Sequence, residues 1–376
     1  MKRKFDFVTE ALEKIKTRNL YRKLQDNRVH GPYIIFKKKK FINLCSNDYL
    51  GLGSSKISNM QLQSSSRLVA GNDISFSILE KKLATHKSQE SALIFPTGYM
   101  ANLGSISILA QKDDLILSDE LNHASIIDAC RLSNAKISVY KHNDTEDLTK
   151  KIRQKADRKF IITEGIFSMN GDFADLKKIS EITDKNNTML VLDDAHGDFV
   201  TGRDGKGSAE QYGVSKKIDV YVSSLSKGLG AFGGYVASSD KIIDLTVNTS
   251  RPFIYTSALP SFLIDLALKR FSSKRERHRK KLWNNVKRMQ KGLESIGYTI
   301  NSSSQIIPII IGDEKKTLEF GKHLFDKGIF AQPIRYPTVA LGSARIRISI
   351  TGLLTQEHIE RALDVFASAG KKFGIL

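Results

Sequence analysis

Seven apolar runs between Phe41 and Ser239 constrain the fold of this chain more than any other feature. The runs are SALIFPTG, DDLILSD, KISVYKH, KFIITEGIF, TMLVLDDAH, DVYVSSLS and GGYVASS. Helix-like segments lie between them. Their apolar character is continuous rather than alternating, which is typical of strands that are covered on both faces. The sequence therefore predicts an α/β fold with a mostly parallel central sheet, helices on both faces and functional groups at the strand ends.

The segments on either side of this region have a different pattern. Residues 5–24 have the spacing of one amphipathic helix, and a basic extended arm through GPYIIFKKKK follows it. After Pro260 the pattern changes to a long helix, the runs QIIPIIIG and ARIRISIT, a helix near KTLEFGKHLFDKG and a last helix from Gln356. We therefore expect an N-terminal helix and arm over 1–40, a large α/β domain over 41–250 and a smaller α+β domain over 251–376.

The chain is strongly basic. It has 59 Lys and Arg against 40 Asp and Glu, a formal net charge of +19, which favours anionic partners such as nucleic acid or a phosphorylated substrate. In the densest basic stretch, residues 269–291, Leu282, Val286 and Met289 have helical spacing, so we interpret it as a surface helix with a solvated basic face. No zinc-finger spacing or aromatic RNA-binding signature accompanies it, and no nucleic acid is expected as a partner. The same charge would attract a polyanion such as coenzyme A.

Cysteine content and hydropathy exclude further classes of protein. Cys45 and Cys130 are the only cysteines, too few for a disulfide framework or a metal site, and we expect both to be buried, reduced thiols. No apolar stretch reaches the roughly 18 residues of a membrane helix. Asp6 and Glu10 stand where a signal peptide would need apolar residues. We therefore expect no membrane association and a cytoplasmic location.

Polar side chains follow two of the predicted strands. TMLVLDDAHG places Asp193 and His196 after one strand, and VYVSSLSKGLG places Ser224 and Lys227 after the next. Each fragment alone has another explanation. The first can be a helix cap or a metal half-site, and the second can be a surface lysine beside a glycine-rich turn. Together they suit a pyridine cofactor, because a carboxylate can keep its ring nitrogen protonated while a lysine amine carries it. The pair predicts pyridoxal 5'-phosphate (PLP), with Asp193 at the ring nitrogen and Lys227 as the covalent anchor.

Two strand-to-helix junctions supply the remaining requirements of this cofactor. IFPTGYMANLG offers a strand, then Thr97, Gly98 and Tyr99, then a helix whose N-terminal N–H groups can bind a phosphate dianion. Ser224 can add a hydroxyl group. DELNHASIIDA places His123 at a second junction, as a flat partner for the ring, although a histidine at such a position is more often structural.

Nine motifs occur in order along nearly the whole chain, from about Arg22 to the last helix. They are NDYLGL, SRLVAGN, TGYMAN, NHAS, TEGIFSMNGD, LDDAHG, SLSKGLG, YTSALP and ARIRIS. Together they resemble the α-oxoamine synthases, which are fold-type-I PLP-dependent transferases. Members of this family are acyltransferases that condense an amino acid with an acyl-coenzyme A thioester and release carbon dioxide.

The resemblance implies a role for each residue near the cofactor ring. Lys227 holds the cofactor and is the base for the substrate Cα proton, while Asp193 pairs with the ring nitrogen. His123 stacks on the ring. His196 and Ser168 resemble the groups near the phenolic oxygen of the cofactor.

The resemblance also implies how the cofactor phosphate is bound. Gly98, Tyr99 and Ser224 match phosphate contacts of the same subunit. Thr256 and Ser257 match the family segment that reaches the phosphate of the neighbouring subunit, which implies a homodimer with active sites at its interface. The alternative for these two residues is a helix N-cap before the proline that follows them.

Substrate-side positions are also matched. Arg347, in ARIRIS, resembles the arginine that holds the amino-acid carboxylate, a task suited to a planar bidentate donor. Arg345 would share its face of a strand, and we interpret it as structural. Further matches are Asn47, Arg22 and Thr338, with Arg335 nearby. For Arg22 a surface arginine, and for Thr338 a turn before a strand, are the alternatives.

Two departures from the family pattern affect the acyl pocket. The segment between Leu52 and Arg67 is short, and Phe76 stands where a histidine is common; both lie in the region expected to border the acyl chain. NLYRKL, the HND after the third strand run, SRLVAGN and the compact length most resemble the branch of the family that condenses alanine with a pimeloyl thioester, carried by coenzyme A or a carrier protein. Glycine with acetyl-coenzyme A is the alternative within the family. A PLP aminotransferase is the rival outside it.

Overall fold

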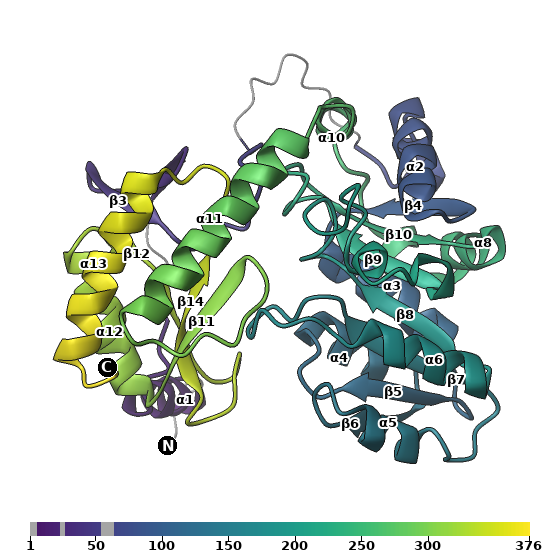
Figure 1. The fold of residues 1–376 in the computed structure, drawn as a ribbon. Coiled ribbons are helices and arrows are strands. Elements are labelled where there is room, and N and C mark those ends of the chain that lie inside the picture. The colour runs from purple at the N-terminus through teal and green to yellow at the C-terminus, as the bar shows by residue number, and fades with distance from the viewer. Residues whose placement is uncertain (1–5, 23–26, 54–63) are drawn as a thin grey trace. The chain divides into compact units, whose positions relative to one another are not determined.

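The structure, a computed structural model, describes residues 6–22, 27–53 and 64–376, with no side-chain detail before Leu12 (Figure 1). It consists of two compact units. The first unit contains residues up to 47, 169–171 and 280–376, and the second contains 48–168 and 172–279. The boundary expected at 250/251 falls inside the second unit.

A seven-stranded sheet forms the centre of the second unit, in the order β4-β10-β9-β8-β7-β5-β6. Only β10 runs antiparallel to its neighbours, and the other described pairs of this sheet are parallel. The strands are β4 (Ser91–Phe95), β5 (Leu115–Asp119), β6 (Lys136–Tyr140), β7 (Lys159–Glu164), β8 (Met189–Asp193), β9 (Val220–Ser224) and β10 (Gly234–Ser238). Each apolar run of the sequence forms one strand, so the predicted mostly parallel sheet is confirmed.

This sheet carries a separate apolar core on each face. On β5, Leu115 and Leu117 pack into one core, while Ile116 between them packs into the other. The first core is covered by α2 (Ile74–Lys87), α5 (Thr145–Lys151), α6 (Leu176–Asn186) and α10 (Ser261–Phe271). The second is covered by α3 (Gly98–Leu109), α4 (Ala124–Leu132), α8 (Asp240–Thr249) and α9 (Arg251–Ile254). Burial on both sides explains why the runs read as continuously apolar.

The first unit contains two small sheets, with orders β1-β2-β3-β12 and β11-β14-β13. The strands of the first sheet are β1 (Arg28–His30), β2 (Tyr33–Phe36), β3 (Lys39–Asn43) and β12 (Ile329–Phe330). Those of the second are β11 (Ile306–Gly312), β13 (Gln332–Ile334) and β14 (Ala344–Ser349). The helices are α1 (Asp6–Thr17), α12 (Glu314–Asp326) and α13 (Gln356–Lys372), together with most of α11 (Glu276–Ser295).

Two expectations for the N-terminal region were wrong. The first helix ends at Thr17 instead of residue 24, and Asn19 has a left-handed φ of 57°. The basic arm, residues 31–40, folds into an antiparallel hairpin of β2 and β3, in which Phe36 pairs with Lys39 across a turn at Lys37 and Lys38 with left-handed φ of 45° and 69°. Alternate side chains of β2 are buried, which is the period of a strand with one buried face.

The predicted long helix after Pro260 is two helices, α10 and α11, separated at residues 272–275. On α11 the apolar positions Leu282, Val286 and Met289 are at most 2% exposed, as expected of a surface helix. No described helix is long and apolar enough to cross a membrane.

The two thiols differ in exposure. Cys130 is buried as expected, whereas Cys45 is only half-buried. Burial raises the pKa of each to about 12. Both thiols are therefore protonated at neutral pH. Separately, the described residues contain no cluster of His, Cys, Asp and Glu side chains that could hold a metal ion.

His142 joins two carboxylates at the carboxyl edge of the large sheet. Its Nδ1 lies 2.9 Å from Asp119 and its Nε2 2.7 Å from Asp172. Burial acts to lower the pKa of His142, but the hydrogen bonds to the two carboxylates outweigh it and raise the pKa to about 10.

We predict that His142 stabilises the fold in a pH-dependent way. The folded-state pKa lies above the value of about 6.5 for an exposed histidine, so the contribution is complete below pH about 6.5 and is lost as the pH rises toward 10. Thermal unfolding of wild type and His142→Gln should differ most near pH 6 and converge near pH 10. His30→Gln, at an exposed strand position, is the control. A gap in Tm that stays constant across this range would contradict the prediction.

Candidate functional site

The residues expected to bind the cofactor gather at one edge of the seven-stranded sheet. Asp193 ends β8 and Ser224 ends β9, with His196 and Lys227 in the loops that follow. His123 follows β5 at the start of α4. Because the carboxyl ends of parallel strands meet at one edge, residues more than 100 positions apart in the chain come together there.

Lys227 contacts His196 in this cluster. The Nζ atom of Lys227 lies 2.9 Å from Nε2 of His196, and the other ring nitrogen, Nδ1, lies 2.7 Å from the Tyr49 hydroxyl. When the Lys227 ammonium donates to Nε2, the imidazole proton resides on Nδ1 and is donated to Tyr49. Tyr49, in NDYLGL, is fully buried and was not predicted as a site residue.

The Asp193 carboxylate is held by hydrogen bonds on both oxygens. Oδ1 accepts from the backbone N–H of Ala195 at 2.9 Å, and Oδ2 accepts from the Asn102 amide at 2.6 Å. Only 8% of Asp193 is exposed, so these bonds replace the water that an ionised carboxylate requires. The sequence indicated Asp193 but not Asn102.

His123 occupies the N-cap position of α4. Its Nδ1 lies 2.8 Å from the Ser125 hydroxyl and accepts the Ser125 backbone N–H at 3.2 Å. The ring meets that of Tyr99 edge-on, with 6.3 Å between centroids. Burial lowers the pKa of His123 despite the nearby Asp193, and the imidazole is therefore neutral at neutral pH.

The N-terminus of α3 lies at the position where the sequence predicted a phosphate site. Thr97 caps the helix, its hydroxyl accepting from the Met100 N–H at 3.1 Å, while the preceding N–H groups have no partner within the helix. Gly98 faces Ser224 so closely that a Cβ at Gly98 would lie 3.3 Å from the Ser224 Cβ. Tyr99 is partly exposed and donates its hydroxyl to Asp128.

Glu164 is a buried acid that the sequence did not indicate as functional. It ends β7, pairs in register with Asp193 on β8 and is 2% exposed. The backbone N–H groups of His123 and Ser168 hydrogen-bond to its carboxyl group, and its Oε1 has no partner among the described residues. Burial first, and then the charge of Asp193, raise the pKa of Glu164 well above its usual range. Of these two adjacent buried acids, Glu164 is therefore the one whose charged form is disfavoured.

Thr256 and Ser257 lie just before α10, and the helix-cap alternative is wrong for both. The N-cap position of α10 is Pro260, and no side chain caps the helix. Thr256 is half-buried and Ser257 is exposed.

The two departures from the family pattern can be placed only in part. Residues 54–63, the middle of the short segment, lie outside the described residues. Phe76 is 1% exposed and belongs to the core of the second unit, where the Arg67 guanidinium lies 4.3 Å from its ring centroid. In this unit Phe76 fills the protein core.

The expected substrate-side residues lie in the first unit. Arg347, on β14, donates to Asn47 at 3.3 Å and to the Ser349 hydroxyl at 2.8 Å. Arg345 donates to the Asn170 side chain at 2.6 Å, in agreement with its interpretation as structural. Arg22 donates to the Tyr336 carbonyl, Arg335 donates to the Asn19 carbonyl, and Thr338 is exposed.

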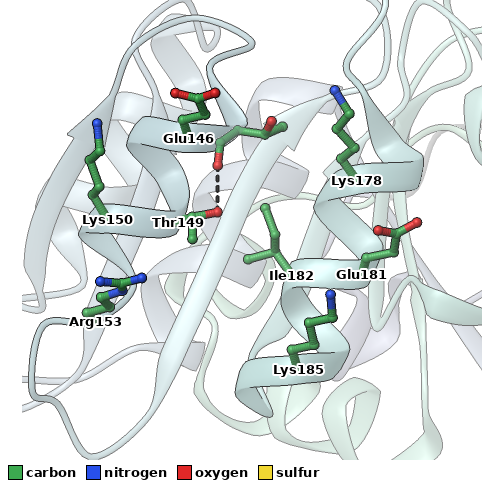
Figure 2. Close-up of a pocket in the computed structure, with 9 residues that line it drawn as sticks. Glu146, Thr149, Lys150, Arg153, Lys178, Glu181, Ile182 and Lys185 are labelled. Carbon is green, nitrogen blue, oxygen red and sulfur yellow. Dashed lines mark hydrogen bonds between the residues drawn. The ribbon is translucent and has the colours of Figure 1, made fainter.

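A groove of about 440 Å³ between α5 and α6 contains none of these residues (Figure 2). Its walls carry Lys150, Arg153, Lys178 and Lys185 together with Glu146 and Glu181. It is open to solvent, and charges of both signs on two exposed helices are typical of a solvated surface. We do not assign it a function.

The residues of the second unit fit PLP. A buried carboxylate suits a protonated ring nitrogen, and a lysine amine beside an imidazole suits covalent attachment. The neutral His123 ring can stack on a pyridine, and the N-terminus of α3 with Ser224 suits a phosphate dianion.

Comparisons with known proteins agree with this geometry. Residues 39–366 match the family model described as aminotransferase class I and II. The chain is 39% identical to an 8-amino-7-oxononanoate synthase of Thermoanaerobacter pseudethanolicus, over 99% of this chain and 98% of that one. A serine palmitoyltransferase solved with PLP has a TM-score of 0.91 at 28% identity and covers 99% of both chains. An 8-amino-7-oxononanoate synthase of Francisella tularensis has a TM-score of 0.77 at 28% identity, covering 89% of this chain and 99% of that one.

We predict that Glu164→Gln behaves like the wild type, because a neutral glutamic acid and a glutamine both offer an oxygen to the two backbone N–H groups. Glu164→Ala should lower the free energy of unfolding by about 1–3 kcal/mol, since it leaves buried donors unsatisfied. Urea unfolding and PLP titration of both variants test this. If Glu164→Gln were as damaging as Glu164→Ala, a charged Glu164 would be required instead.

Proposed function

The chain belongs to the α-oxoamine synthases, within the aminotransferase class I and II family, and from this membership we propose that it condenses L-alanine with a pimeloyl thioester. The products are 8-amino-7-oxononanoate, carbon dioxide and the free thiol, in the biosynthesis of biotin. The observation that carries the choice of substrates is the full-length similarity to 8-amino-7-oxononanoate synthases, and the grouping of Lys227, Asp193 and His123 at one sheet edge supports the use of PLP.

We assign tasks in this reaction to the clustered residues of the second unit. When bound, PLP supplies an electron sink for the negative charge that develops at the substrate Cα. In this assignment Asp193 would hold the protonated ring nitrogen, and His123 would pack on the ring. Lys227 takes the Cα proton and later returns one, and His196, 2.9 Å from its amine, orients that amine and can share its proton.

The phosphate and the phenolic oxygen of the cofactor have their own groups. We assign the phosphate to the α3 N–H groups at Gly98 and Tyr99 and to the Ser224 hydroxyl. Ser168, which is buried and whose N–H bonds to Glu164, is assigned with His196 to the phenolic oxygen.

The substrate carboxylate is assigned to Arg347. A guanidinium can bind a carboxylate through two parallel hydrogen bonds, which fixes the amino acid before its proton is removed. Arg347 would hold the carboxylate until it leaves as carbon dioxide, after the new carbon–carbon bond has formed. We further assign Asn47, Arg22 and Thr338 to the substrates.

We propose a homodimer in which Thr256 and Ser257 reach the phosphate of the neighbouring subunit. The absence of a capping bond from either residue to α10 leaves their hydroxyl groups available for this task. Sedimentation equilibrium at micromolar concentration tests the dimer. A cytoplasmic location remains a prediction from the sequence.

We predict that alanine with pimeloyl-coenzyme A gives the highest kcat/KM in a matrix of amino acids and acyl thioesters, with mass analysis of the product. Glycine should retain some turnover, because discrimination by one methyl group amounts to about 1–3 kcal/mol. Lys227→Ala is the control and should be inactive. A preference for glycine with acetyl-coenzyme A would favour the 2-amino-3-ketobutyrate ligase reaction. Transfer of the amino group to a keto acid, without a thioester, would indicate an aminotransferase.

We predict that Arg347→Ala weakens alanine binding about tenfold or more, because a charge-assisted hydrogen bond contributes about 1.5–3 kcal/mol. PLP affinity should not change. The measurement is the change in cofactor absorbance on titration with alanine. Arg345→Ala, on the same strand, is the matched control and should bind alanine normally. Unchanged alanine binding in Arg347→Ala would point to Arg335 instead.

A further inference from the structure

We propose that Asn102 and Ser125 are positioning residues that hold the Asp193 carboxylate and fix which ring nitrogen of His123 carries the proton. This inference rests on the proposed function, because it concerns residues assigned to PLP. One continuous chain of hydrogen bonds supports it. His123 Nδ1 lies 2.8 Å from Ser125 Oγ, which lies 2.9 Å from Asn102 Nδ2, which in turn lies 2.6 Å from Asp193 Oδ2.

The direction of every bond in this chain follows from the chemistry of the groups. An ionised carboxylate only accepts hydrogen bonds, so Asn102 presents its NH₂ group to Asp193. The second hydrogen of that NH₂ group goes to the Ser125 oxygen. The Ser125 hydroxyl hydrogen is then available to His123 Nδ1, which also accepts the Ser125 backbone N–H at 3.2 Å. With Nδ1 accepting twice, the proton of the neutral imidazole resides on Nε2.

Burial makes this arrangement hard to replace. Asn102 is 2% exposed and Ser125 is 1% exposed, so water cannot readily take over a broken bond. The three bonds join α3, α4 and the end of β8, each of which belongs to the core of the second unit. The carboxylate and the imidazole are therefore oriented before a cofactor enters the site.

The test uses three variants, Asn102→Ala, Ser125→Ala and the double variant, and compares each of them with the control Ser105→Ala. Ser105 is the matched control because it lies on α3, is fully buried and bonds only to helix carbonyls. PLP is titrated into each apoprotein, and the pH midpoint of the visible cofactor band is then measured. Asn102→Ala should raise the Kd for PLP about tenfold, and Ser125→Ala about threefold, relative to Ser105→Ala. The double variant should show less than the sum of the two effects, because both changes break the same chain.

The pH midpoint separates positioning from general destabilisation. The midpoint should move upward in Asn102→Ala and in Ser125→Ala, because a loosely held Asp193 leaves less positive charge on the ring nitrogen. Ser125→Thr keeps the hydroxyl group and should restore the midpoint of wild type. If the Kd and the midpoint of Ser125→Ala match those of Ser105→Ala, the inference is wrong, even if Asn102→Ala does not fold. If wild type binds no PLP, or Lys227→Ala keeps the band of wild type, the proposed function itself fails.

Discussion

Burial of the large sheet on both faces is the constraint on which the rest of the second unit depends. Because helices cover both sides of the inner strands, the middle of each of these is buried and apolar and polar groups collect at the strand ends, whereas the edge strand β6 is largely exposed. Asp193, Ser224 and Glu164 are each the last residue of their strand. The chemistry therefore gathers at one edge because the cores leave no other place for it.

The end of β8 is held from both helical layers. Asp193 accepts from Asn102 on α3, while its neighbour Asp194 pairs with Lys87 on α2 at 3.0 Å. Lys87 also pairs with Asp198 at 2.8 Å, and Asp198 accepts from Ser223 on β9. Paired buried charges of this kind are costly to disrupt. Two consecutive carboxylates thus fix the strand end from opposite sides, and Asp193 meets the cofactor site on a rigid support.

The sequence predicted those parts of the structure that local pattern determines. Continuous apolar runs identified all seven strands of the large sheet, and the residues after them indicated Asp193 and Lys227. It failed where tertiary pairing decides the outcome. The hairpin in the basic arm depends on a turn at Lys37 and Lys38, and lysine is not a residue type that predicts a turn. Asn102, Ser125 and Glu164 each have at least one partner that lies more than 20 positions away in the chain, and no local signal identifies such a partner.

Asp193 and Glu164 show how one strand edge can hold two neighbouring buried acids with different hydrogen-bond partners. The two residues are register neighbours on parallel strands, so ionising both would place like charges side by side in a buried site. Asp193 has an amide and a backbone N–H directed at its two oxygens, whereas Glu164 leaves Oε1 without a partner among the described residues. Hydrogen bonds satisfy both Asp193 oxygens, whereas burial, and then the charge of Asp193, raise the pKa of Glu164. Glu164 can therefore order the backbone of His123 and Ser168 beside the Asp193 carboxylate, at a position where burial disfavours a second charge.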